Sequence, residues 1–151
     1  MSVACILRFA GAWLLGAVLA LGTCGCDSPV QLEQATLRID GSQLDVWIAE
    51  TPDQLSEGLQ AVDEIAEGEG MLFVWDEPSD RVFEIKDVGY ALDVIFVDED
   101  GEVVAIERLE PGADGVASAG EPVLWVVEAR AGWSEEHGVA EGSRLTLDEG
   151  P

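Results

Sequence analysis

Short stretches of alternating apolar and polar residues run along the chain from about residue 35 onward. Segments 37–39 and 44–48 alternate in this way, and Asp40-Gly41 lies between them. A period of two is typical of a strand with one buried face, and an Asp-Gly pair between two such strands favours a tight turn. The pattern therefore predicts a β-hairpin near the start of the domain.

A helix is predicted to begin directly after this hairpin. Thr51 is suited to the N-terminal cap, Pro52 to the first helical position and Gln54 to the closing position of a capping box. Leu55 and Leu59 lie one turn apart, so we expect both to face the core.

Further strands are predicted along the rest of the chain. The segment 92–97 is apolar on both faces apart from Asp93, which indicates a central strand. The expected strands are Met71–Trp75, Arg81–Lys86, Leu92–Val97, Glu102–Ile106, Val123–Glu128 and an edge strand at Arg144–Leu147.

Two remaining segments complete the pattern. A helical turn is expected from Gly132 to Gly138, because glycine readily adopts the left-handed conformation that ends helices. The segment from Pro111 to Pro122 is rich in glycine, proline and small residues and predicts a mobile loop. Together the elements predict an α+β fold, namely a compact, mostly antiparallel β-sheet or half-open barrel of about seven strands with two short helices.

The first 26 residues have a different character. Arg8 is the only charged side chain before Asp27, and the apolar run Phe9–Gly22 is shorter than the roughly 20 residues that span a bilayer as a helix. This pattern is typical of a secretory signal peptide. Its end resembles a bacterial lipobox, with lipid attachment expected at Cys24 or, in the alternative register, at Cys26. An uncleaved transmembrane anchor or an ordinary cleaved signal remains the alternative.

The interpretation divides the chain into a signal peptide (residues 1–23), a tether (24–34) and one globular domain (35–151). The three cysteines, Cys5, Cys24 and Cys26, all precede residue 27, so the domain has neither a disulfide nor a thiolate metal site. We expect an exported, membrane-anchored lipoprotein of the cell envelope that faces the periplasm or the exterior.

The strong acidic charge narrows the choice of partners. Asp and Glu total 31 against 7 Lys and Arg, which gives a net charge of -24. Nucleic acid is not expected as a partner, because phosphate binding needs a basic patch. His137 is the only histidine, which is too few for a structural zinc site, and no cofactor or metal is indicated.

Several short motifs follow one another in a characteristic order, and the most specific is Gly70-Met71-Leu72-Phe73. Between about Leu44 and Leu147 the order and spacing resemble a bacterial and archaeal family, the domain of unknown function 192. The resemblance implies a compact β-rich α+β domain, often exported or membrane-tethered, with no established enzymatic activity. The other matching positions are Ile48-Ala49-Glu50-Thr51, Gly58-Leu59, Phe83, Lys86, Leu92-Asp93, Phe96, Asp100-Gly101, Pro111, Glu128, Ala131-Gly132 and Gly138.

The chain departs from the family pattern mainly at polar positions. Family members usually have an arginine at the position of Leu55 and a methionine at that of Gln60, and a further arginine is expected near Val62. The segment 83–88 replaces a phenylalanine-tryptophan-methionine-lysine-asparagine-threonine stretch, and Ala91 replaces a proline. This pattern suggests a retained scaffold whose polar site has changed.

Three surviving charged positions, Lys86, Asp93 and Glu128, are the candidate ligand-binding residues; no catalytic residue is assigned. Lys86 is expected on the strand face opposite Phe83 and Ile85. Asp93 is likewise expected on the face opposite Leu92, Val94 and Phe96, the largest apolar set of its strand. We therefore expect both on one outer face, where they could form a cross-strand ion pair. Glu128 would join them only if its strand lies beside theirs.

The function expected from these observations is a non-enzymatic accessory or binding domain on a lipid anchor, with an unknown ligand. Two alternatives stay open. One is a carboxylate-dependent hydrolase with Asp93 or Glu128 as general acid or base, which a cleft holding both would favour. The other is an acidic subunit that binds a basic protein.

Overall fold

The computed structural model describes residues 30–62, 64–112 and 115–148. The expected signal segment lies outside the described residues, as do Cys24 and Cys26 with the expected lipid attachment. Within the described ranges, no helix is long and apolar enough to cross a membrane.

The described chain is mostly β-structure. Seven strands form one sheet in the order β6-β5-β8-β3-β2-β1-β9, and β4 and β7 form a separate two-stranded ribbon. The elements are β1 (Glu33–Ile39), β2 (Ser42–Ala49), α1 (Pro52–Glu57), the 3-10 helix η1 (Gly58–Ala61), β3 (Glu69–Ser79), β4 (Phe83–Glu84), β5 (Leu92–Val97), β6 (Val103–Leu109), β7 (Val116–Ala117), β8 (Val123–Arg130), α2 (Trp133–Glu136) and β9 (Leu145–Leu147).

The large sheet is antiparallel except between β2 and β3. Parallel neighbours need a crossover connection, and here α1 and η1 lie within it. Thr51 and Gln54 form the predicted capping box at the start of α1, with Pro52 as its first residue. The capped helix therefore begins where the sequence predicts it.

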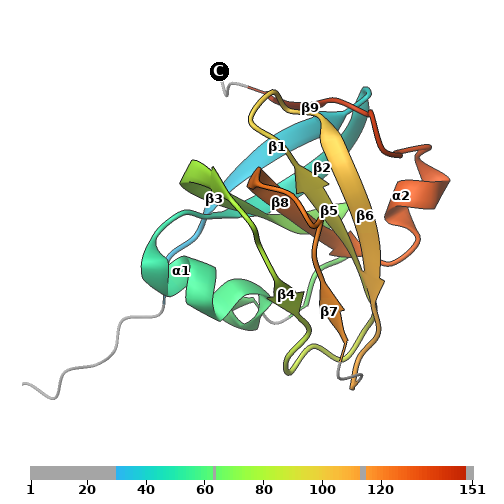
Figure 1. The fold of residues 1–151 in the computed structure, drawn as a ribbon. Coiled ribbons are helices and arrows are strands. Elements are labelled where there is room, and N and C mark those ends of the chain that lie inside the picture. Colours follow the sequence, from blue (N-terminus) through green and yellow to red (C-terminus); the bar gives the residue numbers. More distant parts are fainter. Residues whose placement is uncertain (1–29, 63, 113–114, 149–151) are drawn as a thin grey trace, which may run out of the picture.

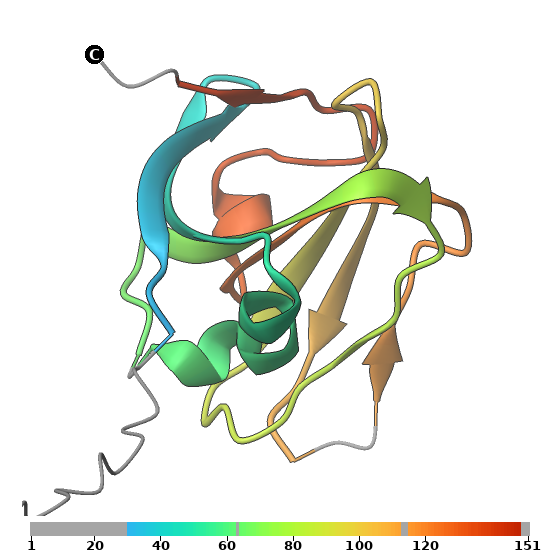
Figure 2. The ribbon, with the colours of Figure 1, turned by 90° about the vertical axis from the view of Figure 1, so that its left-hand side faces the viewer.

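The sheet curls into a half-barrel, as Figures 1 and 2 show. At one end its two edges meet, because the chain before β9 bonds to the start of β6. The Val103 amide donates to the Ser143 carbonyl at 2.8 Å, and the Leu145 amide donates to the Gly101 carbonyl at 2.8 Å. The predicted half-open barrel with about seven strands and two short helices is thus confirmed in outline.

The two faces of the curled sheet form two separate cores, with α1 and α2 on opposite sides (Figure 1). The inner core lies under α2, and the outer core lies under α1, η1 and β4. Side chains alternate between the faces along each strand. The inner core includes Leu37, Leu72, Ile95, Val127 and Trp133. The outer core includes Leu59, Met71, Phe73, Val94 and Phe96.

Element bounds agree best inside the large sheet. The first hairpin and the strand at residues 92–97 are confirmed, although β1 already begins at Glu33, within the expected tether. The strand expected over residues 81–86 is only two residues long, and the predicted loop 111–122 contains β7. The two short strands pair with each other. Because this pairing joins distant segments, the local pattern does not reveal it.

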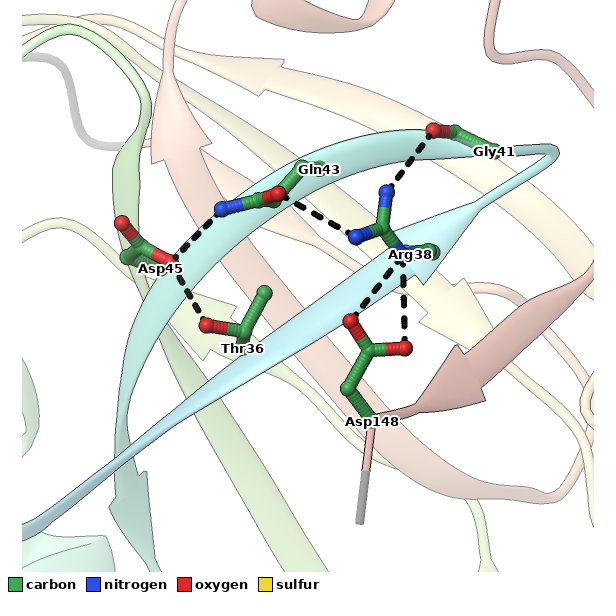
Figure 3. A network of polar contacts seen from close by, with 6 residues as sticks. All are labelled: Thr36, Arg38, Gly41, Gln43, Asp45 and Asp148. Atoms are coloured by element: carbon green, nitrogen blue, oxygen red, sulfur yellow. Dashed lines mark hydrogen bonds and ion pairs between the residues drawn. The ribbon is translucent and has the colours of Figure 1, made fainter. Parts of the chain in front are cut away.

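An exposed polar network fastens the first hairpin to the C-terminal strand (Figure 3). Arg38 Nε donates to Asp148 Oδ2 at 3.0 Å, and an Nη atom of Arg38 donates to Gln43 Oε1 at 3.3 Å. Thr36 Oγ1 donates to Asp45 Oδ1 at 2.8 Å. Exposed contacts of this kind contribute little to stability, and here the polar groups bond to one another. We therefore assign the network to the scaffold.

Candidate functional site

A cavity of about 520 Å³ lies on the outer face of the sheet, between the α1–η1 segment and the segment that carries β4. Both segments are seen beside each other in Figure 1. This volume falls in the range of small-molecule sites. The lining comprises residues 55–60 and 80–86 together with Phe73, Trp75, Val88, Leu92 and Glu128.

Aromatic rings form one wall of the cavity. Phe83 meets Phe73 edge-on with ring centroids 4.9 Å apart, and it meets Trp75 edge-on at 6.2 Å. The Arg81 guanidinium carbon lies 4.2 Å from the centroid of Trp75. Ring pairs at these separations are favourable contacts, so this part of the wall is apolar and well packed.

Two glycines of the family-like motifs lie where a side chain would disturb this region. Gly58 has a φ of +53°, which other residues rarely adopt, and a Cβ there would approach the Phe73 ring to 3.4 Å. A Cβ at Gly70 would overlap the backbone carbonyl oxygen of Glu128. Gly70 therefore allows β3 to approach β8 at the residue that forms the base of the site.

Glu128 is the unusual residue of the cavity. Its cross-strand neighbours are Met71 on β3 and Val94 on β5, and both are fully buried. The Glu128 residue is only 5% exposed, and within residues 30–62, 64–112 and 115–148 no hydrogen bond or ion pair reaches its carboxyl group, whose oxygens are not fully sealed from the cavity. Burial in this apolar setting raises the pKa of Glu128 to about 8. At neutral pH the group is therefore mostly protonated.

Lys86 lines the same cavity but does not pair with Glu128. Its side chain is exposed, as expected, and its ammonium lies 2.6 Å from the carboxylate of Glu84. The hydrogen bond that Lys86 donates to the Glu84 carboxylate, aided by the negative charge of that residue, raises the pKa of Lys86. Lys86 is therefore part of the rim, whereas Glu128 lies at the base.

Asp93 lies on the opposite face of the sheet. It pairs in register with Ala129, whereas Glu128 pairs with Val94, so the two acids alternate in orientation. The prediction that Asp93 shares an exposed outer face with Lys86 is wrong. Asp93 points to the inner face of the sheet, and α2 covers that face. The three candidates therefore do not converge on one site.

The contacts of Asp93 explain its burial. One carboxylate oxygen accepts from Arg108 Nε and Nη2 at 3.1 and 3.0 Å. The other accepts from the amides of Gly132 and Ser134 at 3.0 and 3.1 Å. Gly132 is the N-cap of α2 and has no side chain that could accept these bonds, so Asp93 caps the helix from β5. The expected Lys86–Asp93 ion pair is replaced by an Asp93–Arg108 pair.

Several lining residues were not anticipated, among them Ser56, Trp75 and Arg81. Their place depends on how β4 folds over the sheet, which no local pattern encodes. The one available signal is Glu128 itself, an acidic residue directly after the apolar run 123–127.

No metal site accompanies the cavity in the described ranges, where no group of three His, Cys, Asp or Glu side chains is placed to hold an ion. His137 is exposed at the end of α2, and its ring stacks on Trp133 with centroids 4.7 Å apart. Its Nδ1 lies 2.8 Å from the Trp133 carbonyl oxygen.

Comparisons with known proteins agree with this architecture. The structure is similar to that of a "putative transcription regulator" from Sinorhizobium meliloti, with 29% sequence identity and a TM-score of 0.73 over 80% of this chain and 98% of the other. It is also similar to a protein of unknown function from Novosphingobium aromaticivorans, with 26% identity and a TM-score of 0.67 over 80% and 88% of the two chains. No curated protein matches. Residues 35–147 match the family DUF192, described as "uncharacterized ACR". Since the match runs from β1 to β9, this chain belongs to the DUF192 family, as its motifs indicated.

Proposed function

We propose that this protein is a lipid-anchored binding protein of the cell envelope, whose non-enzymatic domain holds a small organic molecule in the cavity on the outer face. The observation that carries the proposal is Glu128, a buried carboxyl group that has no protein partner and borders a cavity of about 520 Å³. Buried polar side chains are nearly always hydrogen-bonded, so one without a partner calls for a specific explanation. A ligand that satisfies it supplies that explanation.

The geometry favours binding over hydrolysis. A hydrolase of the kind considered would place two carboxyl groups in one cleft. Asp93, the expected second group, lies on the other face, and both of its oxygens are occupied by Arg108 and by α2. The expected pair of Asp93 and Glu128 therefore does not meet in one cleft.

The description of the Sinorhizobium meliloti relative as a transcription regulator does not fit this chain well. DNA binding depends on basic groups free to neutralise phosphates. The net charge is -24, and every basic side chain in the described part already has a partner within the protein. The contacts are Arg38–Asp148, Arg81–Trp75, Lys86–Glu84, Arg108–Asp93, Arg130–Glu64 and Arg144–Glu102.

The binding role is tested by filling the cavity. Ser56 is an exposed residue of α1 that lines the cavity, and Asp53 is an exposed residue of the same helix that does not. Native mass spectrometry of protein isolated from its own membranes should detect a bound small molecule on the wild type and on Asp53→Trp. The molecule should be absent from Ser56→Trp. No bound molecule on the wild type, or equal occupancy in all three proteins, would contradict the proposal.

The anchor is tested separately. Metabolic labelling with a fatty acid should mark the protein, and replacing Cys24 and Cys26 together with serine should release it or leave it unprocessed. Each single replacement then identifies the register. Unlabelled, full-length protein in the membrane would instead support a transmembrane anchor.

A further inference from the structure

We propose that the cavity binds an organic cation, a small molecule with a protonated amine or guanidinium group on an apolar or aromatic body, and that the charged group pairs with the carboxylate of Glu128. This inference rests on the binding role proposed above and names the chemical class of the ligand.

The first support is the mismatch between Glu128 and its surroundings. A buried carboxylate is unfavourable unless a charge or several hydrogen bonds offset its lost hydration. Met71 and Val94 beside it offer neither. Without a partner, the group avoids the charge by retaining a proton, as its raised pKa of about 8 indicates. A cation in the cavity would supply the missing partner and favour the ionised form.

The second support is that the nearest basic residue on the same strand points its charge elsewhere. Arg130 lies two positions beyond Glu128 on β8, so its side chain leaves the sheet on the same face. Its Nε donates to the Ile65 carbonyl at 2.8 Å, its Nη2 pairs with Glu64, and its guanidinium lies 4.3 Å from the Tyr90 ring centroid. These contacts leave Glu128 without this neighbour as a counter-charge.

The two basic residues of the cavity wall do not pair with Glu128 either. Lys86 pairs with Glu84 at the exposed rim. Arg81 packs over the Trp75 ring and its Nη2 donates to the Glu77 carbonyl at 3.1 Å, while its Nε is buried without an acceptor. Because none of the three neighbouring cations bonds to Glu128, its carboxyl group is available to a cation from solution.

The third support is the character of the rest of the site. Phe73 and Phe83 line the cavity, and the face of an aromatic ring attracts ammonium and guanidinium groups. Trp75 already holds the Arg81 guanidinium over its ring in this way. Besides the Lys86–Glu84 pair, Arg81 and Glu128, the titratable groups of the wall are both acidic. They are Glu57 on α1 and Asp80, which precedes β4 in the chain. The net charge of -24 raises the local concentration of cations and repels anions.

Binding of this kind is coupled to the release of a proton. The ligand keeps its own proton, while Glu128 changes from carboxylic acid to carboxylate and its proton passes to the buffer. Below the pKa of about 8 of the empty site, the affinity should therefore fall as the pH falls, by up to about tenfold per pH unit.

Three probes of similar shape test the charge of the ligand on the full chain. Isothermal titration calorimetry compares 2-phenylethylamine, 2-phenylethanol and 3-phenylpropionate. We expect the amine to bind about tenfold or more tightly than the alcohol, which is the scale of a buried charge pair, and the carboxylate to bind most weakly. Titration of the amine near neutral pH in buffers of different ionisation enthalpy should show the release of close to one proton.

Matched variants then locate the effect. In Glu128→Gln the preference for the amine and the proton release should both disappear. Glu141→Gln removes an exposed acidic group that lies outside the cavity lining and should retain both, because its charge is screened from the site. Circular dichroism confirms that each variant is folded, and the wild-type probe series needs no variant at all.

The outcomes separate this inference from the binding role. Equal binding of the three probes, abolished by Ser56→Trp, would overturn the cationic ligand and leave the cavity as a binding site. An amine preference that survives in Glu128→Gln would overturn the pairing with Glu128. If no probe binds the wild type, the cationic class is overturned, while native mass spectrometry on Ser56→Trp still decides the binding role by itself.

Discussion

Asp93 and Glu128 lie on neighbouring strands, are almost equally buried at 2% and 5% exposure, and have opposite surroundings. Asp93 accepts bonds at both oxygens, from Arg108 and from two amides at the start of α2. Glu128 has apolar neighbours and borders an open cavity. The comparison teaches that burial of an acid does not by itself mark a functional site. The number of partners that the protein supplies separates a structural acid from one available to a ligand.

The difference follows from how each face of the sheet is covered. On the inner face, α2 packs with its first amides toward the strands, and these donors need an acceptor. On the outer face, α1 and the β4 segment cover the sheet incompletely and leave the cavity. Asp93 therefore completes the fold, whereas the partner of Glu128 has to come from outside.

The largest expected effect is on the structural acid. Replacing Asp93 with alanine leaves two helix amides without an acceptor, so we expect the free energy of unfolding to fall by about 4 kcal/mol. Urea denaturation followed by circular dichroism measures this change. Arg108→Ala serves as the matched control and should have a smaller effect, because the Arg108 side chain is 48% exposed. If Asp93→Ala lowered the free energy of unfolding by less than about 1 kcal/mol, Asp93 would not have the structural role that distinguishes it from Glu128.

The next effect concerns the pH dependence of stability at Glu128. Its pKa is raised from 4.5 to about 8 on folding, so the folded protein holds this proton more tightly than the unfolded chain. Stability from this group is therefore complete below pH 4.5 and is lost as the pH rises toward 8. Between about pH 6 and about pH 7.5, the free energy of unfolding of the wild type should fall by about 2 kcal/mol relative to Glu128→Gln.

Parallel urea titrations of the two proteins across this range make the measurement. The glutamine variant is the reference, because it shares every other acidic group and cancels their titration. Parallel pH profiles for the two proteins would show that Glu128 has a partner after all, and the contrast with Asp93 would vanish.

The smallest effect is expected at the third candidate residue. Lys86 forms an exposed pair with Glu84, so Lys86→Ala should leave the urea midpoint unchanged within error. Amine binding measured by calorimetry should stay the same or tighten by less than about threefold, since only a screened positive charge is removed from the rim. A marked loss of binding would make Lys86 a direct ligand contact and require a negatively charged group on the ligand.

The sequence alone determined those features that depend on neighbouring residues. Alternation around Asp40-Gly41 predicts the first hairpin, the Thr51–Gln54 capping box predicts the start of α1, and the apolar run 92–97 predicts a central strand. The spacing of short motifs also indicated the family. Each of these signals is local, because turns, caps and side-chain alternation act over a few residues.

Only the tertiary structure decided which candidate residues share a site. Alternation along β5 shows that Asp93 opposes Val94, but both faces of this strand are buried, so the pattern does not reveal which face α2 will cover. β4 forms part of one wall of the cavity, and it pairs with β7, from which the strands β5 and β6 separate it along the chain. Such contacts depend on which distant surfaces meet when the sheet curls. The sequence could therefore name Glu128 as a candidate, but only the packing of α1, β4 and the sheet around it shows a buried acid without a partner.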